Sequence, residues 1–123
     1  MKILVVDDEQ YVCDFLEEFL AMKGYKIDIT LSGKEALAFV ENKNYDLMLL
    51  DILMPDMSGL QVLEKMKEKK IEVPVIVVTG VKDNKIALEA INMGAVDYIT
   101  KPIDLDRLEQ SILVNSISKQ KIN

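Results

Sequence analysis

Chemically useful side chains stand directly after four apolar runs of the sequence. Asp7 and Asp8 follow a run of Ile, Leu and Val, and Asp51 follows a run of Leu and Met. Thr79 and Lys101 come at the ends of two further runs. If these runs are strands of one parallel sheet, their carboxyl ends meet at one edge, where such sheets bind ligands. The spacing therefore predicts one shared site with carboxylates, a hydroxyl and an ammonium group.

The predicted site concentrates negative charge and needs cations. Two carboxylates about 4 Å apart repel each other by about 4 kcal/mol at an effective dielectric constant near 20. Lys101 supplies one positive charge. A divalent ion that takes oxygen ligands, keeps some waters and needs one or two carboxylates supplies the rest, and this description fits Mg²⁺. A single acidic loop residue is usually ordinary, but four complementary strand ends together favour a function.

The composition excludes several other kinds of chemistry. The chain has 123 residues, a formal net charge of −6, no His and one Cys. Catalysis by His, an internal disulfide and a zinc site of Cys and His ligands are thereby excluded. The acidic charge argues against direct binding to nucleic acid, which relies on clustered Lys and Arg. No apolar stretch suits a membrane span or a signal peptide, so we expect a cytoplasmic protein that does not contact a membrane.

Five short apolar runs alternate with helical patterns, at intervals that suit strand-helix units. Several runs are apolar without alternation, as expected of strands that are covered on both faces. The predicted strands occupy residues 3–6, 26–30, 47–50, 75–78 and 98–100. We therefore predict a single doubly wound α/β domain over residues 1–118, followed by a polar tail at 119–123.

Apolar spacing of three and four residues predicts a helix after each strand. The apolar face of the first helix is expected to contain Val12, Phe15, Leu16, Phe19 and Leu20. The other helical stripes are Ala36, Phe39 and Val40; Leu60, Leu63 and Met66; Ile86, Ala87, Ala90 and Ile91; and Leu105, Leu108 and Ile112. Cys13 has no cationic neighbour on its helix to lower its pKa, so we assign it no chemical role.

The chain resembles, along its whole length, the receiver (CheY-like) domains of two-component response regulators. Residues 3–9 resemble the first strand and acidic pair of that family, and residues 51–59 resemble its phosphoacceptor and the following loop. Thr79-Gly80 and Lys101-Pro102 match its two remaining signatures. The resemblance implies a flavodoxin-like five-stranded parallel sheet of order 2-1-3-4-5, with five helices on two faces.

The resemblance also implies a role for each residue of the site. Asp51 would accept a phosphoryl group from a histidine kinase or a histidine phosphotransfer protein. Thr79 and Lys101 would bind the phosphoryl oxygens, and the bond between Lys101 and Pro102 is cis in the family. Phosphoryl transfer needs positioning and charge neutralisation more than covalent help, so this set of groups suffices.

In the same family Mg²⁺ is bound at the phosphoacceptor. By resemblance, Asp8 and Asp51 would bind the ion directly, together with the backbone carbonyl of Leu53. Asp7 would hold a water molecule on the metal.

The resemblance also implies that one pair of residues acts in switching and a second pair in hydrolysis of the phosphoryl group. Thr79 would move toward the phosphoryl group, and Tyr98 would turn into the space that it leaves. Leu53 and Val81 stand two residues after Asp51 and Thr79, where the family tunes loss of the phosphoryl group. Neither side chain can orient a water molecule by hydrogen bonding, so we predict slow self-dephosphorylation.

Two alternatives stay open at this point. A Mg²⁺-dependent aspartyl phosphohydrolase would place a second Asp two residues after the nucleophile, where Leu53 stands. A degenerate receiver would keep the acidic site but bind its partners without phosphorylation. A nucleotide-binding loop is excluded, because acidic residues stand where its glycines would follow the first strand.

We expect the chain to signal through protein contacts and not to be an enzyme, since few residues follow the last predicted helix. By resemblance, residues 84–118 would contact a downstream protein or form a dimer that depends on phosphorylation. The kinase would dock near Val12 and Ile103. Val12 fits equally well as a member of the buried face of its helix.

Overall fold

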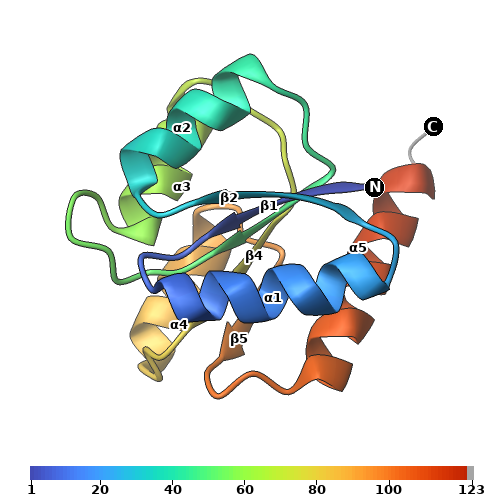
Figure 1. The fold of residues 1–123 in the computed structure, drawn as a ribbon. Helices are drawn as coiled ribbons and strands as arrows, with labels where there is room; N and C mark the ends of the chain where they lie inside the picture. The colour runs from blue at the N-terminus through green and yellow to red at the C-terminus, as the bar shows by residue number, and fades with distance from the viewer. Residues whose placement is uncertain (122–123) are drawn as a thin grey trace.

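Five parallel strands form one sheet at the centre of the molecule (Figure 1). The computed structural model describes residues 1–121, with the side chains of residues 1–116. The strands are β1 (Lys2–Val6), β2 (Lys26–Thr30), β3 (Leu47–Leu50), β4 (Val75–Thr79) and β5 (Asp97–Thr100). Their order is β2-β1-β3-β4-β5, and every neighbouring pair is parallel. The predicted fold class is confirmed.

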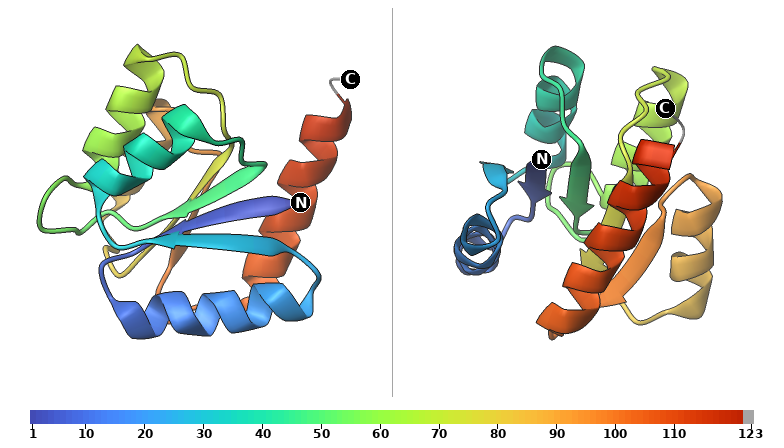
Figure 2. Two further views of the ribbon diagram at one scale, coloured as in Figure 1. Left: turned by 45° about the horizontal axis from the view of Figure 1, so that its top comes forward. Right: turned by 90° about the vertical axis from the view of Figure 1, so that its right-hand side faces the viewer.

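Five helices cover the two faces of this sheet (Figure 2). They are α1 (Gln10–Met22), α2 (Gly33–Asn42), α3 (Gly59–Glu68), α4 (Asn84–Asn92) and α5 (Leu105–Lys121). Helix α5 includes residues 119–121 of the predicted tail, and residues 122–123 lie outside the described residues. The division of the chain into a domain at 1–118 and a tail stays a prediction. Within residues 1–121, no helix has the length and apolar character of a membrane span.

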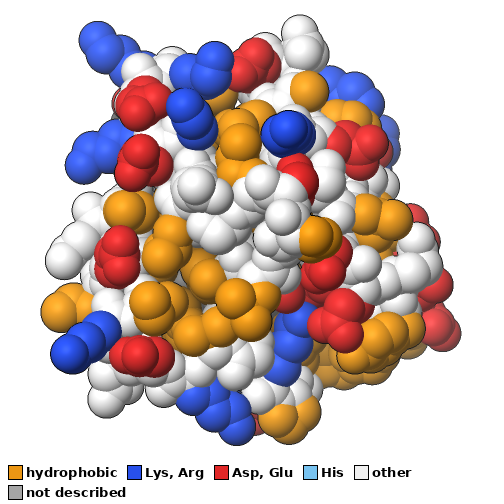
Figure 3. All heavy atoms as spheres, turned by 90° about the vertical axis from the view of Figure 1, so that its left-hand side faces the viewer, with side chains coloured by type: hydrophobic (Ala, Val, Ile, Leu, Met, Phe, Trp, Pro, Cys, Tyr) orange, Lys and Arg blue, Asp and Glu red, His pale blue; other side chains and the backbone are white. Residues whose placement is uncertain are grey.

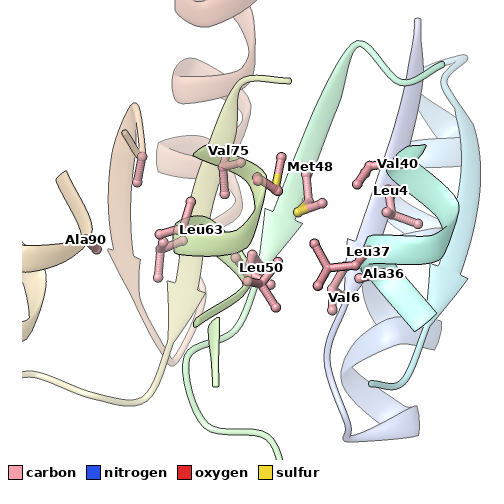
Figure 4. Close-up of a cluster of buried hydrophobic side chains, with 14 of the residues drawn as sticks. Leu4, Val6, Ala36, Leu37, Val40, Met48, Leu50, Leu63, Val75 and Ala90 are labelled. Atoms are coloured by element: carbon pink, nitrogen blue, oxygen red, sulfur yellow. The ribbon is translucent and has the colours of Figure 1, made fainter. Parts of the chain in front are cut away.

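The sheet carries a separate hydrophobic core on each face. Side chains of a strand alternate between the faces, so Leu4 and Val6 pack beneath α2 and α3, whereas Ile3 and Val5 pack beneath α1 and α5. The first of these cores is drawn in Figure 4, with Met48 and Leu50 of β3 at its centre. Burial on both faces explains why the central strands have no polar alternation.

The predicted apolar face of α1 is wrong at one position. Phe15 is 47% exposed, whereas Cys13 is fully buried. The stripe that contacts the sheet consists of Val12, Cys13, Leu16 and Leu20. A helix on a sheet buries a narrow stripe, and sequence spacing alone does not show which edge of a wider apolar face is covered. Ile91 of α4 is likewise exposed.

Three helices end with the same hydrogen-bonding motif. After α1, the N–H of Gly24 donates to Ala21 and the N–H of Tyr25 donates to Leu20. This Schellman motif requires a left-handed backbone conformation, which glycine adopts at little cost. Gly94 takes the same place after α4, with φ of 109°. After α3, Lys70 occupies this left-handed position, with φ of 57°.

The loop between β3 and α3 folds tightly against the end of β3. Gly59, the first residue of α3, donates its N–H to the carbonyl of Ile52 at 2.8 Å. A Cβ atom at Gly59 would overlap the carbonyl group of Asp51. Ser58 caps α3, because its hydroxyl accepts from Gln61 N–H and the Gln61 side chain accepts from Ser58 N–H. Gly59 therefore fixes the backbone that presents Asp51.

We predict that Gly59→Ala lowers the free energy of unfolding by about 2 kcal/mol, because the added methyl group forces the backbone at Asp51 to move. Urea unfolding measures the change. Gly80→Ala is the matched control, since a Cβ at Gly80 would meet no atom within 4 Å. Equal unfolding midpoints for the two variants would contradict this account of the loop.

Candidate functional site

The carboxyl ends of four neighbouring strands, β1, β3, β4 and β5, bring the predicted site residues together. Val6 pairs with Leu50, so Asp7 and Asp51 leave adjacent strands side by side. The N–H of Asp51 donates to the carbonyl of Val6 at 3.0 Å. On the other side of β3, the N–H of Lys101 donates to the carbonyl of Thr79 at 2.8 Å. The sheet register thus gathers residues that are up to 94 positions apart in the chain.

Lys101 connects the carboxylates of this site. Its Nζ lies 2.8 Å from Oδ2 of Asp7 and 3.1 Å from Oδ2 of Asp51. The Lys101 side chain is 18% exposed, and those of Asp7 and Asp51 are 4% and 6% exposed. The peptide bond between Lys101 and Pro102 is cis. One ammonium group therefore contacts two almost fully buried carboxylates and neutralises one of their two negative charges.

Glu9 is a third acidic partner of Lys101 to which the sequence analysis gives no role. Its Oε1 lies 3.4 Å from Nζ of Lys101, and its Oε2 accepts a hydrogen bond from the Tyr11 hydroxyl at 2.8 Å. The position of Glu9 directly after the acidic pair is the only sequence signal for this contact.

Burial and charge shift the protonation equilibria of the site in opposite ways. Burial raises the pKa of the Asp7 carboxyl, and the hydrogen bond from Lys101 only partly offsets this effect. For Lys101, burial is the largest single influence and opposes the charge. The hydrogen bonds to Asp7 and Asp51 outweigh it, so the pKa of the ammonium lies above its usual range. Lys101 therefore stays charged at neutral pH.

The oxygens of three carboxylates are close enough to hold one metal ion. Asp7, Asp8 and Asp51 each offer an oxygen, and these oxygens all lie within 4.8 Å of one another. Asp8 is exposed, and it makes no hydrogen bond or ion pair with any described residue. An oxygen-only donor set with open access suits Mg²⁺. The residues present fit the predicted ion.

Backbone groups orient the Asp51 carboxylate. Its Oδ1 accepts from the N–H of Ile52 at 2.7 Å and lies 3.4 Å from the N–H of Leu53, while Oδ2 faces Lys101. The Leu53 side chain is 65% exposed, so it stands in solvent beside the carboxylate. The two oxygens of Asp51 thus have different surroundings.

Thr79 and Tyr98 are connected through the loop after β4. The Thr79 side chain is fully buried, and its Oγ1 accepts from the N–H of Val81 at 3.4 Å. The hydroxyl of Tyr98 donates to the carbonyl of Val81 at 2.6 Å. The half-buried Tyr98 ring packs against the core beneath α3 and α4. Thr79 and Tyr98 are therefore both hydrogen-bonded to the backbone of Val81. No sequence pattern indicates this arrangement.

Several other predicted positions lie close to the site without joining it. The Cys13 thiol contacts the carbonyl of Asp7 at 3.3 Å, and burial raises the pKa of this thiol to about 11. That agrees with the prediction that Cys13 has no chemical role. Val12 is buried in the stripe of α1, which agrees with the alternative that it belongs to the core, and kinase docking near Val12 stays a prediction. Ile103 is half-buried against the core beneath α1 and α5.

Figure 3 looks onto the edge of the sheet where the strands end. Acidic side chains gather there beside a band of apolar ones, and Lys and Arg side chains lie both next to the acidic group and at the periphery. The exposed Leu53 and the half-buried Met54, Met57 and Val81 belong to the loops at this edge. The acidic site therefore lies next to an apolar surface.

The chain is similar to known proteins over nearly its whole length. The family model of the response regulator receiver domain matches residues 3–113. The transcriptional regulatory protein DltR of Streptococcus agalactiae is 39% identical over 108 residues, which are 88% of this chain and 48% of that protein. The chain spans about half or less of the length of the curated relatives it matches. Because these include transcriptional regulators, the prediction of no nucleic-acid contact gains no support from them.

Two solved structures are similar in fold as well as in sequence. The CheY-like response regulator receiver domain protein from Methanospirillum hungatei has a TM-score of 0.93 at 33% identity, covering 99% of this chain and 98% of that one. The response regulator TrrA of Thermotoga maritima, in complex with Mg²⁺ and BeF, has a TM-score of 0.84 at 36% identity, covering 93% and 97%. A family match of this extent, on a sheet of the same strand order, means that the chain belongs to the receiver domains of two-component response regulators.

Proposed function

We propose that this chain receives a phosphoryl group on Asp51 from a phosphohistidine of a histidine kinase or a histidine phosphotransfer protein. The observation that carries this proposal is the contact of one ammonium group, Lys101, with the buried carboxylates of both Asp7 and Asp51. Phosphoryl transfer depends on positioning and charge neutralisation. A fixed carboxylate nucleophile beside a fixed cation meets both needs.

In the transfer, an oxygen of Asp51 attacks the phosphorus atom in line with the bond to the histidine nitrogen. A phosphorus–oxygen bond forms as the phosphorus–nitrogen bond breaks, and the imidazole nitrogen keeps the electron pair and takes up a proton. Lys101 balances the charge of the phosphoryl oxygens. Thr79 accepts from a backbone N–H, which leaves its own hydroxyl proton to donate to one of those oxygens.

Asp8, Asp51 and the backbone carbonyl of Leu53 would hold Mg²⁺, with Asp7 bonded to a water molecule of the ion. When bound, Mg²⁺ neutralises charge on the transferring phosphoryl group. Two observations support this assignment: the carboxylate oxygens converge on one point, and the related TrrA was solved with Mg²⁺ and BeF. Asp8 is exposed and has no other partner among the described residues, so it is free to serve as a ligand.

Phosphorylation would be transmitted through Thr79 and Tyr98. If Thr79 turns toward the phosphoryl group, its contact with Val81 changes, and Val81 is also the residue that holds the Tyr98 hydroxyl. A complete switch from 1:99 to 99:1 requires phosphorylation to favour the active state by about 5.5 kcal/mol. The output would be a change in the surface that meets a downstream protein or a second copy of the chain.

The chain would act as a switch that catalyses only its own phosphorylation and dephosphorylation. A phosphohydrolase of the aspartyl type is disfavoured, because Leu53 offers no acid two residues after the nucleophile. The predicted cytoplasmic location stays a prediction.

Incubation with acetyl phosphate and Mg²⁺ should add the mass of one phosphoryl group to the protein, because Asp51 is a buried carboxylate beside both Lys101 and the loop after β3. Intact mass spectrometry measures the gain. Asp51→Ala should show none, and Asp56→Asn, in the same loop, should keep it. An unmodified wild-type protein would favour a degenerate receiver.

Mg²⁺ at a hundred times its Kd should stabilise the fold by about 2.7 kcal/mol, as for any ligand that binds only the native state. Thermal unfolding with and without Mg²⁺ measures the effect. Without the ion, Asp8→Asn should be at least as stable as the wild type, since it removes a negative charge close to Asp7 and Asp51, and it should lose the stabilisation by Mg²⁺. A variant that kept the full Mg²⁺ effect would rule Asp8 out as a ligand.

The aromatic NMR signals of Tyr98 should differ between the free protein and the protein with Mg²⁺ and beryllofluoride, because a displaced Thr79 alters the Val81 segment that holds the hydroxyl. Tyr45, on the far side of the molecule from β5, serves as the internal control. Identical Tyr98 environments in both samples would contradict the switch.

Leu53→Asn and Val81→Glu should each speed loss of the phosphoryl group by roughly tenfold, because both introduce a group that can orient a water molecule. The decay of phosphorylated protein is followed by intact mass. Leu53→Met and Val81→Ile provide controls of similar shape without that group. Equal decay rates in the polar and apolar variants would show that these positions do not tune hydrolysis.

A further inference from the structure

A groove lies at the edge of the sheet opposite Asp51, where β4 begins. It has a volume of about 740 Å³ and runs between the ends of α3 and α4, with α5 beside it. Figure 2, right, looks onto this edge of the molecule. Its floor is apolar: Leu63, Met66, Ile71, Val73 and Met93 line it and belong to the core beneath α3 or pack against that core. The volume is within the range of small-molecule pockets.

Two lysines flank this apolar floor without a charged partner. Lys67 and Lys70 line the groove, and neither forms an ion pair with any described residue. The neighbouring lysines outside the groove are paired, Lys65 with Glu68 and Lys69 with Glu41. The groove is therefore the place at the end of α3 where positive charge is left uncompensated.

The backbone conformation of Lys70 is a second, independent observation that favours a binding role for its side chain. Gly24 and Gly94 occupy the left-handed position of the same motif after α1 and α4, whereas α3 places Lys70 there at φ of 57°. A side chain in this conformation is strained relative to glycine. The dipole of α3 favours lysines nearby, but Lys65 and Lys67 already occupy its last turn. The dipole thus does not explain a lysine at the strained position.

The charge of the rim restricts what the groove can bind. Glu72 also lines it, so with Lys67 and Lys70 the rim has a single net positive charge. Asn92 and Asn115 add neutral polar groups. A ligand with one negative charge and an apolar body matches this arrangement, whereas a multiply charged anion would meet Glu72.

We propose that the groove binds a small amphipathic monocarboxylate, whose apolar chain lies on the floor and whose carboxylate meets Lys67 and Lys70. The occupant is a free small molecule, because the site is a concave groove of small-molecule volume and a protein partner needs about 800 Å² of surface on each side. The groove is at the opposite edge of the sheet from the phosphoacceptor, so the proposal does not depend on phosphorylation.

Decanoate is the probe, titrated into ¹⁵N-labelled full chain and followed by amide chemical shifts. We expect saturable shifts at Ile71, Val73 and Met93. The uncharged 1-decanol should bind at least about fivefold more weakly, as a lost charge-assisted contact would require. Asp51→Ala should bind decanoate like the wild type, which keeps this test separate from the test of phosphorylation.

Lys70→Gly is the decisive variant, because glycine keeps the left-handed backbone and removes only the side chain. It should raise Tm by about 3 °C through relief of strain and weaken decanoate binding about fivefold. Lys67→Gln should weaken binding to a similar extent. The matched controls Lys65→Gln and Lys69→Gln, which lie outside the groove, should bind as the wild type does.

Three results would overturn the proposal. Unchanged affinity in Lys70→Gly and Lys67→Gln would show that the lysines do not hold the carboxylate. Shifts that are scattered over the surface and do not saturate would mean non-specific adsorption. Groove shifts that appear on raising the protein concentration, with no decanoate present, would assign the groove to a second copy of the chain.

Discussion

The ammonium group of Lys101 holds together two buried carboxylates that would otherwise repel each other. Asp7 and Asp51 leave neighbouring strands side by side, and both are almost completely removed from water. Removing one partner of a buried ion pair is costly, because the remaining charge is then buried without compensation. The raised pKa of Asp7 shows that Lys101 does not fully offset burial. Two carboxylates and one ammonium group leave one net negative charge in the pocket, which a metal ion would neutralise.

The rest of the fold positions the side chains of Asp7, Asp51 and Lys101 next to one another. Two cores fix the sheet from both faces, so the strand ends keep their register. Gly59 lets the loop after β3 approach the Asp51 backbone, and Ile52 and Leu53 orient the carboxylate through their N–H groups. The loop after β4 carries Val81, which contacts both Thr79 and Tyr98. The site and the proposed switch therefore lie at the same edge of the sheet.

The strands and the convergence of their ends could be predicted from the sequence, because unbroken apolar runs and acidic or basic terminators are local signals. Contacts that depend on three-dimensional packing could not. Phe15 and Cys13 differ only in which side of a helix meets the sheet, and the Tyr98 contact joins residues 17 positions apart. The left-handed backbone conformation of Lys70 could not be predicted either, because no glycine marks that position in the sequence. The strand order came from the resemblance and not from any pattern in the runs.

The most direct test of the central interaction is a double-mutant cycle of Lys101→Met and Asp7→Asn, measured by urea unfolding at neutral pH without Mg²⁺. Lys101→Met alone should destabilise the fold by about 3–5 kcal/mol, because it leaves two carboxylates buried without a cation. In the presence of Asp7→Asn, the same substitution should cost at least about 1 kcal/mol less, since one of the uncompensated charges is gone. Additive effects, equal to within about 0.5 kcal/mol, would contradict the claim that Lys101 neutralises this pocket.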